Sequence, residues 1–449
     1  MTAEKVYDVF IGGLGVSGAS VSYFVCEYLK GATTIAGVEH YEAPALVNSK
    51  SMHNAQTLHR GENETNYDLS HAIEMRDKAK ILEAFLLAHA TKGDGTYRRV
   101  SKMLLGVGDA EVALLRKRYE EFHPYFPYIK LLERDEIALY EPKAVEGRDP
   151  KEPILAFLVE NGFAVNYQKL AELFIASARA SAAARGKTYD TFFNTEITGI
   201  SRDGKLWVIT TTNGTFRARI AIFATGPYSL LFAHRLGYAK DLALLPVAGS
   251  FYRSKIPHLL NGKIYQPQKE GLPFARFHAD TSVEGNGETR FGPTAKPLPL
   301  FERHHWGTFV DFLRIGTFSL RGLRALASIF ASKTVLGFAF KNALYEMPYI
   351  GKRLVLKELQ RIIPTIRARD IELCRGAGGI RPQIIDLAKR KLQMGIETIY
   401  GDDSMFIVTP SPGASSSGKT GETAARKAAE MLGDEHFFDE EAFRKEFGN

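Results

Sequence analysis

The stretch Val6-Tyr7-Asp8-Val9-Phe10-Ile11-Gly12-Gly13-Leu14-Gly15-Val16-Ser17-Gly18 decides the fold of this chain. It begins as a short apolar strand, and residues 19–25 continue it with the spacing of a helix. Gly13, Gly15 and Gly18 occupy the three glycine positions of a dinucleotide-binding fingerprint. These glycines permit the tight turn, the approach of the pyrophosphate and the close packing of helix on strand. The alternative, a chance cluster of glycines in a loop, does not explain the order of strand, glycines and helix.

A second strand strengthens this interpretation. Residues 33–38 are an apolar run, and Glu39 follows them at the distance where an acidic side chain can hold a ribose hydroxyl. We therefore predict an α/β fold with a Rossmann-like domain. The fingerprint and the acid together predict these cofactor contacts: Gly13, Leu14, Gly15, Val16, Ser17, Gly18 and Glu39.

Length, charge and cysteine content limit the remaining possibilities. A chain of 449 residues, 45% of them hydrophobic, should form about two or three domains. The net charge of +7 suits an anionic substrate or an anionic membrane surface, and without a zinc-knuckle spacing or a basic-aromatic repeat we expect no nucleic-acid partner. Cys26 and Cys374 are too few for a disulfide framework or a metal cluster, so we expect a cytoplasmic setting and no metal site. No secretory signal is visible at the N-terminus.

Periodicity predicts the further organisation of the chain. The expected helices span residues 77–87, 111–122 and 167–185, the last with Asn166 as N-cap and Gly186 at its end, and the expected strands span residues 196–201, 206–212 and 215–223. The last strand runs into Ala224-Thr225-Gly226, which resembles the segment that returns to the nucleotide domain in flavoproteins with two dinucleotide folds. We therefore expect a discontinuous FAD-binding domain of residues 1–75, 162–229 and 371–435. Residues 76–161 and 230–370 would form a substrate domain built on an antiparallel sheet.

A basic and apolar segment, residues 303–345, forms part of the expected substrate domain. It carries six Lys or Arg residues against one acid, together with Trp306 and many Phe residues. Lys333 and Lys341 interrupt its apolar tract, so it is a poor transmembrane helix. Such a segment suits an amphipathic helix on an anionic membrane surface, and the alternative is a surface hairpin whose Phe residues pack into the core.

The polar segment 52–67 is too rich in His, Asn and Thr to be core, so we expect it to lie against the reactive part of the cofactor. It belongs to a series of motifs along the chain: Asn54-Ala55, Thr57, His59, Glu64 and Asn66-Tyr67; Glu146-Gly147-Arg148-Asp149-Pro150; Val165-Asn166-Tyr167; His278 and Asp280-Thr281; Phe291-Gly292-Pro293; Arg381 with Gln383-Ile384-Ile385; and Ser411-Pro412-Gly413-Ala414-Ser415. In this order they resemble the FAD-dependent malate:quinone oxidoreductases. That family is a branch of the flavoprotein group that includes D-amino-acid oxidase and L-2-hydroxyglutarate dehydrogenase.

The resemblance implies a function. It implies FAD as cofactor, oxidation of L-malate to oxaloacetate, a membrane quinone as electron acceptor and a peripheral position on the inner face of the cell membrane. The flavin contacts expected beyond the fingerprint are Asn54, Gln56, Thr57, Leu58, His59, Val165, Thr225, Gly226, Gly379, Arg381, Gly413, Ala414 and Ser415.

Two departures from the family pattern concern the substrate. The chain has Gln56-Thr57-Leu58-His59 where the family often has Gly-Thr-Gly-His, and Arg60 where it often has Ser. His53-Asn54, followed by His59 and Gly61, instead resembles the hydroxyglutarate dehydrogenases. L-lactate and L-2-hydroxyglutarate therefore stand as alternative substrates.

Oxidation of a 2-hydroxy acid requires a base for the hydroxyl proton and an anchor for the carboxylate. His278 is the first candidate for the base because imidazole titrates near neutrality, and Asp280 would stabilise its charged form. Arg381 offers a planar fork for the carboxylate, next to a glycine-rich turn. His59 is expected as a flavin contact first and as an alternative base second. The structural alternatives are an ordinary polar histidine and an arginine that pairs with a surface acid.

Malate carries a second carboxylate, which needs its own partner. The available candidates are Arg60, Lys419 and His53. If none of them reaches that carboxylate, a monocarboxylate such as lactate becomes the better substrate.

Near the C-terminus, residues 411–415 precede a helix expected to begin around Gly421. A small-residue loop that leads into a helix can present N–H groups to the flavin, so Gly413 and Ala414 are candidates for cofactor binding. The alternative is a plain turn with an N-cap. Residues 413–420 also fit a phosphate-loop spacing, but Pro410 and Pro412 interrupt the passage from strand to loop.

A second nicotinamide fingerprint is missing, so electrons should leave to a quinone, to oxygen or to another protein. A peroxide-forming oxidase is the rival within catalysis. A non-catalytic flavin-binding redox sensor is the rival outside it.

Overall fold

The fingerprint strand β1 (Val6–Gly12) lies near the centre of an eight-stranded sheet with the order β20-β21-β10-β1-β3-β7, to which the β8–β9 hairpin is added through β10. β1 pairs in parallel with β10 and β3, and β10 pairs in parallel with β21. The other strands of this sheet are β3 (Thr34–Val38), β7 (Thr188–Phe192), β8 (Ile197–Asp203), β9 (Leu206–Thr211), β10 (Gly214–Phe223), β20 (Glu397–Gly401) and β21 (Ser404–Val408). The computed structural model describes residues 5–268, 276–347, 349–393, 397–410 and 413–448.

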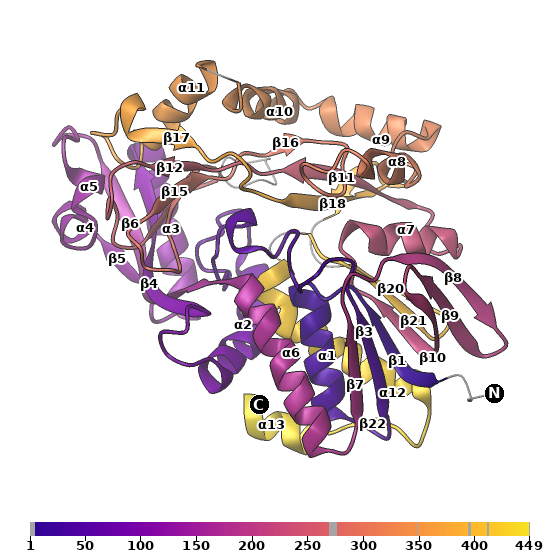
Figure 1. The fold of residues 1–449 in the computed structure, drawn as a ribbon. Coiled ribbons are helices and arrows are strands. Elements are labelled where there is room, and N and C mark those ends of the chain that lie inside the picture. Colours follow the sequence, from indigo (N-terminus) through magenta and orange to yellow (C-terminus); the bar gives the residue numbers. More distant parts are fainter. Residues whose placement is uncertain (1–4, 269–275, 348, 394–396, 411–412, 449) are drawn as a thin grey trace.

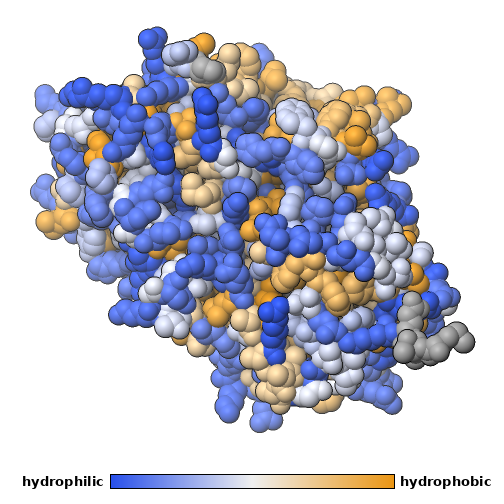
Figure 2. Space-filling model, viewed as in Figure 1, coloured by the Kyte–Doolittle hydropathy of each residue, from blue (hydrophilic) through white to orange (hydrophobic). Residues whose placement is uncertain are grey.

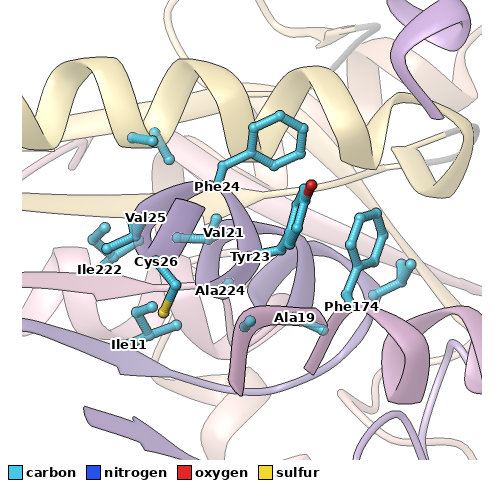
Figure 3. Packing of buried hydrophobic residues seen from close by; sticks show 14 of the residues in the cluster. Ile11, Ala19, Val21, Tyr23, Phe24, Val25, Cys26, Phe174, Ile222 and Ala224 are labelled. Atoms are coloured by element: carbon cyan, nitrogen blue, oxygen red, sulfur yellow. The ribbon is translucent and has the colours of Figure 1, made fainter. Parts of the chain in front are cut away.

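Helices pack on this sheet around the helix that follows the fingerprint (Figure 1). They are α1 (Val16–Tyr28), α2 (Leu69–His89), α6 (Tyr167–Ala184) and α12 (Ser417–Leu432). Figure 3 shows the core between them. There the ring centroid of Tyr23 on α1 lies 5.3 Å from that of Phe24 and 6.0 Å from that of Phe174. Twelve of the 13 residues of α1 are buried, which explains why its sequence is apolar on all sides rather than amphipathic.

Most of the expected elements are confirmed, with shifts at two helix starts. Asn166 caps α6 by accepting from the backbone N–H groups of Gln168 and Lys169. α2 begins at Leu69 rather than at residue 77, because the Asp68 side chain caps an earlier turn. α12 begins at Ser417 rather than near Gly421, since a 3₁₀ turn over Gly413–Ser416 leads directly into it. Ser411 and Pro412 of the expected loop motif lie outside the described residues.

Two further sheets form the other half of the molecule. One has eight strands in the order β17-β12-β15-β14-β13-β4-β6-β5 and the other has four in the order β16-β11-β18-β19. The pairings are antiparallel except for β13 with β4. Their strands are β4 (Tyr97–Val107), β5 (Lys130–Leu132), β6 (Ile154–Val165), β11 (Leu242–Ala248), β12 (Tyr252–Ser254), β13 (Lys263–Tyr265), β14 (His278–Thr281), β15 (Thr289–Gly292), β16 (Lys296–Pro297), β17 (Ile371–Leu373), β18 (Ile380–Asp386) and β19 (Lys391–Gln393). The predicted fold class, a Rossmann-like sheet with a second part built on antiparallel strands, is confirmed.

One segment pairs differently from the expectation. Residues 371–435 were expected in the FAD-binding domain. Within this range β20 and β21 join the nucleotide sheet, whereas β17 pairs with β12 and β18 pairs with β11 over Leu242–Ala248. The alternation of side chains in β18 is compatible with a place in either sheet, so the sequence alone does not identify its partner strand. The limits of the two domains stay a prediction.

The remaining elements connect these sheets or cover them. They are α3 (Asp109–Phe122), α4 (Arg134–Tyr140), α5 (Pro142–Val145), α7 (Pro227–Arg235), α8 (Thr308–Leu313), α9 (Leu320–Phe330), α10 (Lys333–Tyr345), α11 (Ile350–Leu359), α13 (Glu440–Phe447) and the small pair of β2 (Leu29–Lys30) with β22 (Phe437–Phe438). α8 to α11 lie along the outer side of the antiparallel sheets, at the top of Figure 1. Ala325 of α9 is buried against the four-stranded sheet, whereas Leu320 and Leu323 are exposed.

No single helix in the described ranges is long and apolar enough to cross a membrane. α9 and α10 meet that criterion only as a pair, and they bend by 94° where they join. Figure 2 shows hydrophobic surface at the upper right of the molecule, in the region where Figure 1 places α9. The segment 303–345 is therefore partly packed on the sheet and partly an exposed apolar face.

Candidate active site

A cavity of about 600 Å³ lies where the fingerprint meets the antiparallel sheets. Its walls come from the β1–α1 turn, the loop after β3, β14, β18 and the segment before α12. Elements far apart in the sequence therefore supply one site. A cavity of this size with a few convergent polar groups is the usual form of a cofactor and substrate site.

The fingerprint glycines fit a dinucleotide cradle. Gly13 has a φ of +84°, and a Cβ there would lie 2.8 Å from the Ala224 carbonyl oxygen. A Cβ on Gly18 would overlap the carbonyl oxygen of Gly13. On Gly15, in contrast, it would meet only Ser49 Oγ at 3.8 Å, because this glycine faces the cavity at the N-terminus of α1. The backbone is thus open to a phosphate at the position where the helix dipole favours negative charge.

Glu39 closes the adjacent edge of the cavity. Its carboxylate accepts hydrogen bonds from the backbone N–H of Leu14 at 2.8 Å and of Tyr41 at 3.2 Å. Burial raises the pKa of Glu39. The acid both fixes the fingerprint turn and lines the cavity, as expected for a residue that holds a ribose.

The polar loop after β3 carries a histidine and carboxylate pair. His59 Nδ1 lies 2.5 Å from Glu64 Oε1, and the backbone N–H of His59 donates to Ser415 Oγ at 2.9 Å. The Glu64 carboxylate is buried, and although burial alone would raise its pKa, the His59 imidazole and the Lys102 ammonium lower it. Among the described residues no partner is found for Nε2 of His59, which lines the cavity. The pair therefore offers an imidazole nitrogen with a buried carboxylate behind the ring.

Two buried cations hold this loop in place. Lys102 Nζ of β4 donates to the Leu58 carbonyl at 3.2 Å and lies 2.7 Å from Glu62. Arg118 of α3 donates to the carbonyls of Tyr67 and Glu64, each at 2.9 Å. A buried charge is tolerated only when it is paired in this way, so these contacts fix the loop geometry.

The register of β13 and β14 assembles a second histidine pair. Because Ile264 is opposite Ala279 in an antiparallel ladder, Tyr265 faces His278 and Lys263 faces Asp280. The rings of Tyr265 and His278 stack at 4.8 Å between centroids. Asp280 lies 3.1 Å from Lys263 Nζ through one oxygen and 3.1 Å from His278 Nε2 through the other.

Electrostatics keep the buried Asp280 ionised. Burial alone would raise its pKa, but the Lys263 ammonium and the His278 imidazole hold it well below the usual range. Burial lowers the pKa of Lys263 to about 8, against the opposing effect of Asp280. His278 is thus the member of this group that lines the cavity, with a fixed negative charge behind it.

Arg381 lines the cavity from β18, where it is opposite Val247 of β11. Burial lowers the pKa of its guanidinium to about 10. Within the described ranges, no carboxylate lies within the 4.0 Å of a salt bridge to Arg381, whereas Arg148 pairs with Glu152 and Arg118 donates to the backbone carbonyl of Tyr67. A partly buried cation without an anion is costly, so this arginine is available for an anionic ligand.

The structure brings most of the expected site residues together. Those that line the cavity are Gly13, Gly15, Val16, Ser17, Glu39, Asn54, Gln56, Thr57, His59, Thr225, Gly226, His278, Gly379, Arg381, Gly413, Ala414 and Ser415. Those that do not line it are Leu14, Gly18, Leu58, Val165 and Asp280. Leu58 and Val165 point into the main core, and Gly18 serves the packing of α1 on β1.

The three residues considered as partners for the second carboxylate of malate differ in whether they line the cavity. Arg60 lies outside the cavity, paired with Glu83 at 3.2 Å, and Lys419 lies outside it, paired with Glu422 at 2.5 Å. His53 does line the cavity, and burial lowers the pKa of its imidazole. The Lys419–Glu422 pair is three residues apart on α12, whereas Arg60 is in a loop and its partner Glu83 is on α2, which the sequence did not reveal.

Sequence reasoning missed Lys263 and Tyr265. Both are buried residues with a polar group, two positions apart on β13, so they lie on the same face of the sheet. A lysine and a tyrosine at that spacing in an otherwise apolar strand were a visible signal. Their meaning depended on β14 as partner strand, which the sequence did not reveal.

Comparisons with known proteins agree with this geometry. The family model of malate:quinone oxidoreductases matches residues 5–423. A probable malate:quinone oxidoreductase from Campylobacter jejuni is 35% identical over 99% of this chain and 99% of its own length. A malate:quinone oxidoreductase from Helicobacter pylori is 32% identical over 98% of this chain and 97% of its own length.

Solved structures share the fold at low sequence identity. L-alpha-glycerophosphate oxidase from Mycoplasma pneumoniae with FAD bound has a TM-score of 0.64 at 17% identity, covering 97% of this chain and 96% of its own. Glycine oxidase from Bacillus cereus has a TM-score of 0.63 at 19% identity, covering 94% of each chain.

Proposed function

The chain belongs to the malate:quinone oxidoreductase family, and from this premise we propose that it oxidises L-malate to oxaloacetate with FAD and passes the electrons to a membrane quinone. The observation that carries the proposal is the partly buried Arg381, which lines the cavity without a carboxylate partner in the described part of the chain. A dicarboxylate supplies the missing anion. Arg381 would bind one carboxylate through two parallel N–H···O bonds and so orient the adjacent carbon.

The residues of the cavity fit FAD. Gly15 leaves room for the pyrophosphate, Glu39 would accept a ribose hydroxyl, and the segment Gly413–Ser416 would lie near the flavin. When bound, FAD supplies a ring that accepts a hydride from the carbon that bears the hydroxyl group.

We propose His59 as the base that removes the hydroxyl proton. Its Nδ1 is held by the buried Glu64, and its Nε2 carries no partner in the described ranges. The Glu64 carboxylate would stabilise the imidazolium that forms when Nε2 takes the proton. His278, the first candidate from the sequence, has Nε2 against Asp280 and Nδ1 3.3 Å from the Arg276 carbonyl, so both of its nitrogens already face the protein.

His278 has a different part in this proposal. With Asp280 behind it and its ring against Tyr265, it forms a rigid polar wall of the cavity. Of the three candidates for the second carboxylate of malate, His53 lines the cavity, whereas Arg60 and Lys419 do not.

We further propose that the exposed face of the segment 303–345 rests on the inner surface of the cell membrane. Trp306 is 70% exposed, Leu320 65% and Phe340 66%, and Arg321 and Arg324 are exposed beside them on α9. Apolar side chains interleaved with arginines suit an anionic lipid surface, and the net charge of +7 adds attraction. Membrane contact would bring the enzyme to its quinone.

A panel of substrates tests the proposal. Purified holoenzyme would be assayed with ubiquinone-1 and, in turn, L-malate, D-malate, L-lactate and L-2-hydroxyglutarate, while dissolved oxygen is monitored. The proposal expects quinone reduction with L-malate and little oxygen consumption. Faster turnover of L-lactate or L-2-hydroxyglutarate than of L-malate would identify that acid as the substrate instead. Peroxide formation at the rate of malate oxidation would identify an oxidase.

A further inference from the structure

A second cavity, of about 290 Å³, lies under α10 on the side of the antiparallel sheet away from the first. Its lining includes the apolar side chains of Phe277, Pro293 and Phe338 and the polar side chains of Lys341, Tyr345 and Glu358. We propose that this cavity binds the head group of the quinone. The inference rests on the proposed function, because it assigns the place where the electron acceptor of that reaction binds.

The two cavities are separated by a single layer of chain. His278 lines the first and its neighbour Phe277 lines the second, as expected where successive side chains of an extended segment point to opposite faces. Pro293 of the second cavity and Arg381 of the first both lie against Gly249, where a Cβ would be 3.0 Å from Pro293 Cβ and 3.6 Å from Arg381 Nη2. A quinone in the second cavity would therefore be one strand away from the first.

The polar end of the second cavity offers hydrogen-bond donors. Lys341 Nζ lies 2.6 Å from Glu358, Arg276 Nη2 lies 3.4 Å from the same carboxylate, and Tyr345 OH lies 3.5 Å from it. Quinone oxygens are acceptors, so an ammonium or a hydroxyl at this end can bind them. The edge of Tyr345 meets Phe277 at 4.9 Å between ring centroids, which gives the flat ring of a quinone an aromatic surface.

The mouth of the cavity opens on the face that we assign to the membrane. Gly337 lines the cavity and is exposed. Leu336, 54% exposed, and Phe340, 66% exposed, flank it on α10. The isoprenoid tail of a quinone would leave along these side chains into the lipid, while its head group stays inside the protein.

The reaction at this site balances without a further reactant. The quinone gains two electrons from the reduced cofactor and two protons, and becomes the quinol as the cofactor returns to its oxidised form. The Lys341 and Glu358 pair, which lies between the cavity and solvent, can pass protons to the two oxygens. Malate supplies the electrons through the proposed reaction.

A substitution at the mouth tests the site. A Cβ on Gly337 meets no atom within 4 Å and the residue has ordinary helical φ, so Gly337→Trp adds bulk at the opening without strain in the helix. Holoenzyme reduced anaerobically by malate would be mixed with ubiquinone-1 or with dichlorophenolindophenol, a water-soluble acceptor. We expect Gly337→Trp to slow reoxidation by ubiquinone-1 by about tenfold or more, the effect of overfilling a pocket, and to leave malate reduction and reoxidation by the dye unchanged. Ala343→Trp, on an exposed position of the same helix outside the cavity lining, is the matched control and should behave as the parent protein.

Photolabelling gives a readout that does not depend on turnover. An azido derivative of ubiquinone, irradiated with the holoenzyme, should label peptides that contain residues 333–345 or Phe277, and Gly337→Trp should lower that labelling. Labels confined to the first cavity, or ubiquinone-1 reoxidation unchanged in Gly337→Trp, would overturn the inference. If malate does not reduce the enzyme, the proposed function fails by itself, and the quinone site is still tested by reducing the holoenzyme with dithionite before adding ubiquinone-1.

Discussion

Nε2 of His278 lies 3.1 Å from Oδ2 of Asp280, whose other oxygen is 3.1 Å from the ammonium of Lys263. This arrangement places Nε2 of His278 within salt-bridge distance of a carboxylate inside the sheet. It leaves His59, with Nδ1 against Glu64, as the imidazole with a nitrogen available for substrate. The two histidines therefore have different chemical environments although both line one cavity.

The first prediction separates the two histidines. His59→Gln should lower kcat by about 10²- to 10⁴-fold, the usual contribution of a general base. His278→Gln should mainly raise the KM for malate. Steady-state assays with ubiquinone-1 between pH 5.5 and 9 measure both effects. A large loss of kcat in His278→Gln with His59→Gln nearly normal would reverse the two roles.

The second prediction concerns the carboxylate anchor. Arg381→Met should lower kcat/KM for malate by about 100- to 1,000-fold, because it removes a buried bidentate partner of the substrate. Arg381→Lys should recover only part of that loss, since an ammonium cannot reproduce the planar fork. Arg375→Met is the matched control, because Arg375 is exposed on the same segment. An equal loss of kcat/KM at both positions would show that the loss comes from removing a positive charge and not from removing a substrate contact.

A third prediction contrasts two glycines of the fingerprint. Gly15→Ala adds a methyl group that meets only Ser49 Oγ at 3.8 Å, so the apoprotein should keep its Tm while its affinity for FAD falls. Gly18→Ala should lower the Tm of the apoprotein, since its Cβ overlaps the Gly13 carbonyl oxygen. FAD titration by fluorescence and thermal unfolding of the apoprotein distinguish the two. A lower apoprotein Tm in Gly15→Ala with unchanged FAD binding would mean that this glycine serves folding rather than the cofactor.

The fourth prediction is a pH dependence of stability. Burial raises the pKa of Glu141 to about 7 from an ordinary value of 4.5, although its carboxylate accepts from the backbone N–H groups of Asn261 and Gly262. The folded state therefore binds the proton more tightly than the unfolded state. The stability due to this group is complete below about pH 4.5 and is lost as the pH rises through about 7, a change of roughly 3 kcal/mol.

Thermal unfolding of Glu141→Gln measures this dependence. The difference in Tm, variant minus parent, should become more positive between pH 5 and pH 8, because glutamine stays neutral. Glu120→Gln, at an exposed carboxylate, should show no such trend. A difference for Glu141→Gln that is constant with pH would mean that Glu141 is ionised in the folded protein throughout the range.

The fifth prediction concerns the membrane face. Leu323→Glu, at a side chain of α9 that is 49% exposed, should weaken binding to vesicles containing phosphatidylglycerol by about tenfold or more, through lost apolar burial and added repulsion. Leu139→Glu, on α4 at a side chain that is 82% exposed, is the control and should bind as the parent does. Sedimentation with vesicles measures both. Equal binding of parent and Leu323→Glu would place the lipid contact elsewhere.

The sequence predicted the parts of this molecule that depend on local patterns. The fingerprint, Glu39 and the Asn166 cap each follow from residues close together in the chain, and the structure has them where they were expected. The sequence did not identify which strands pair with one another. β18 pairs with β11 rather than with the nucleotide sheet, and Lys263 acquires its meaning only opposite Asp280.

Side-chain partners limited the prediction of the site in the same way. Arg60 and Lys419 were candidates because they carry charge, and the folded chain pairs them with Glu83 and Glu422 outside the cavity. Asp280 was expected beside His278 and lies there, one layer behind the cavity wall. The Arg60–Glu83 pair joins a loop to α2 and depends on packing that charge patterns do not specify, whereas the Lys419–Glu422 pair is three residues apart on one helix.

The central claim is that malate reduces a flavin bound in the cavity and that quinone reoxidises it. The most direct measurement is an anaerobic visible spectrum of the purified holoenzyme during titration with L-malate, followed by addition of ubiquinone-1. The account predicts bleaching of the flavin band by L-malate with formation of oxaloacetate, and full recovery of the band with quinone. A flavin that L-malate leaves oxidised, or a protein that binds no flavin when FAD is supplied, would contradict it.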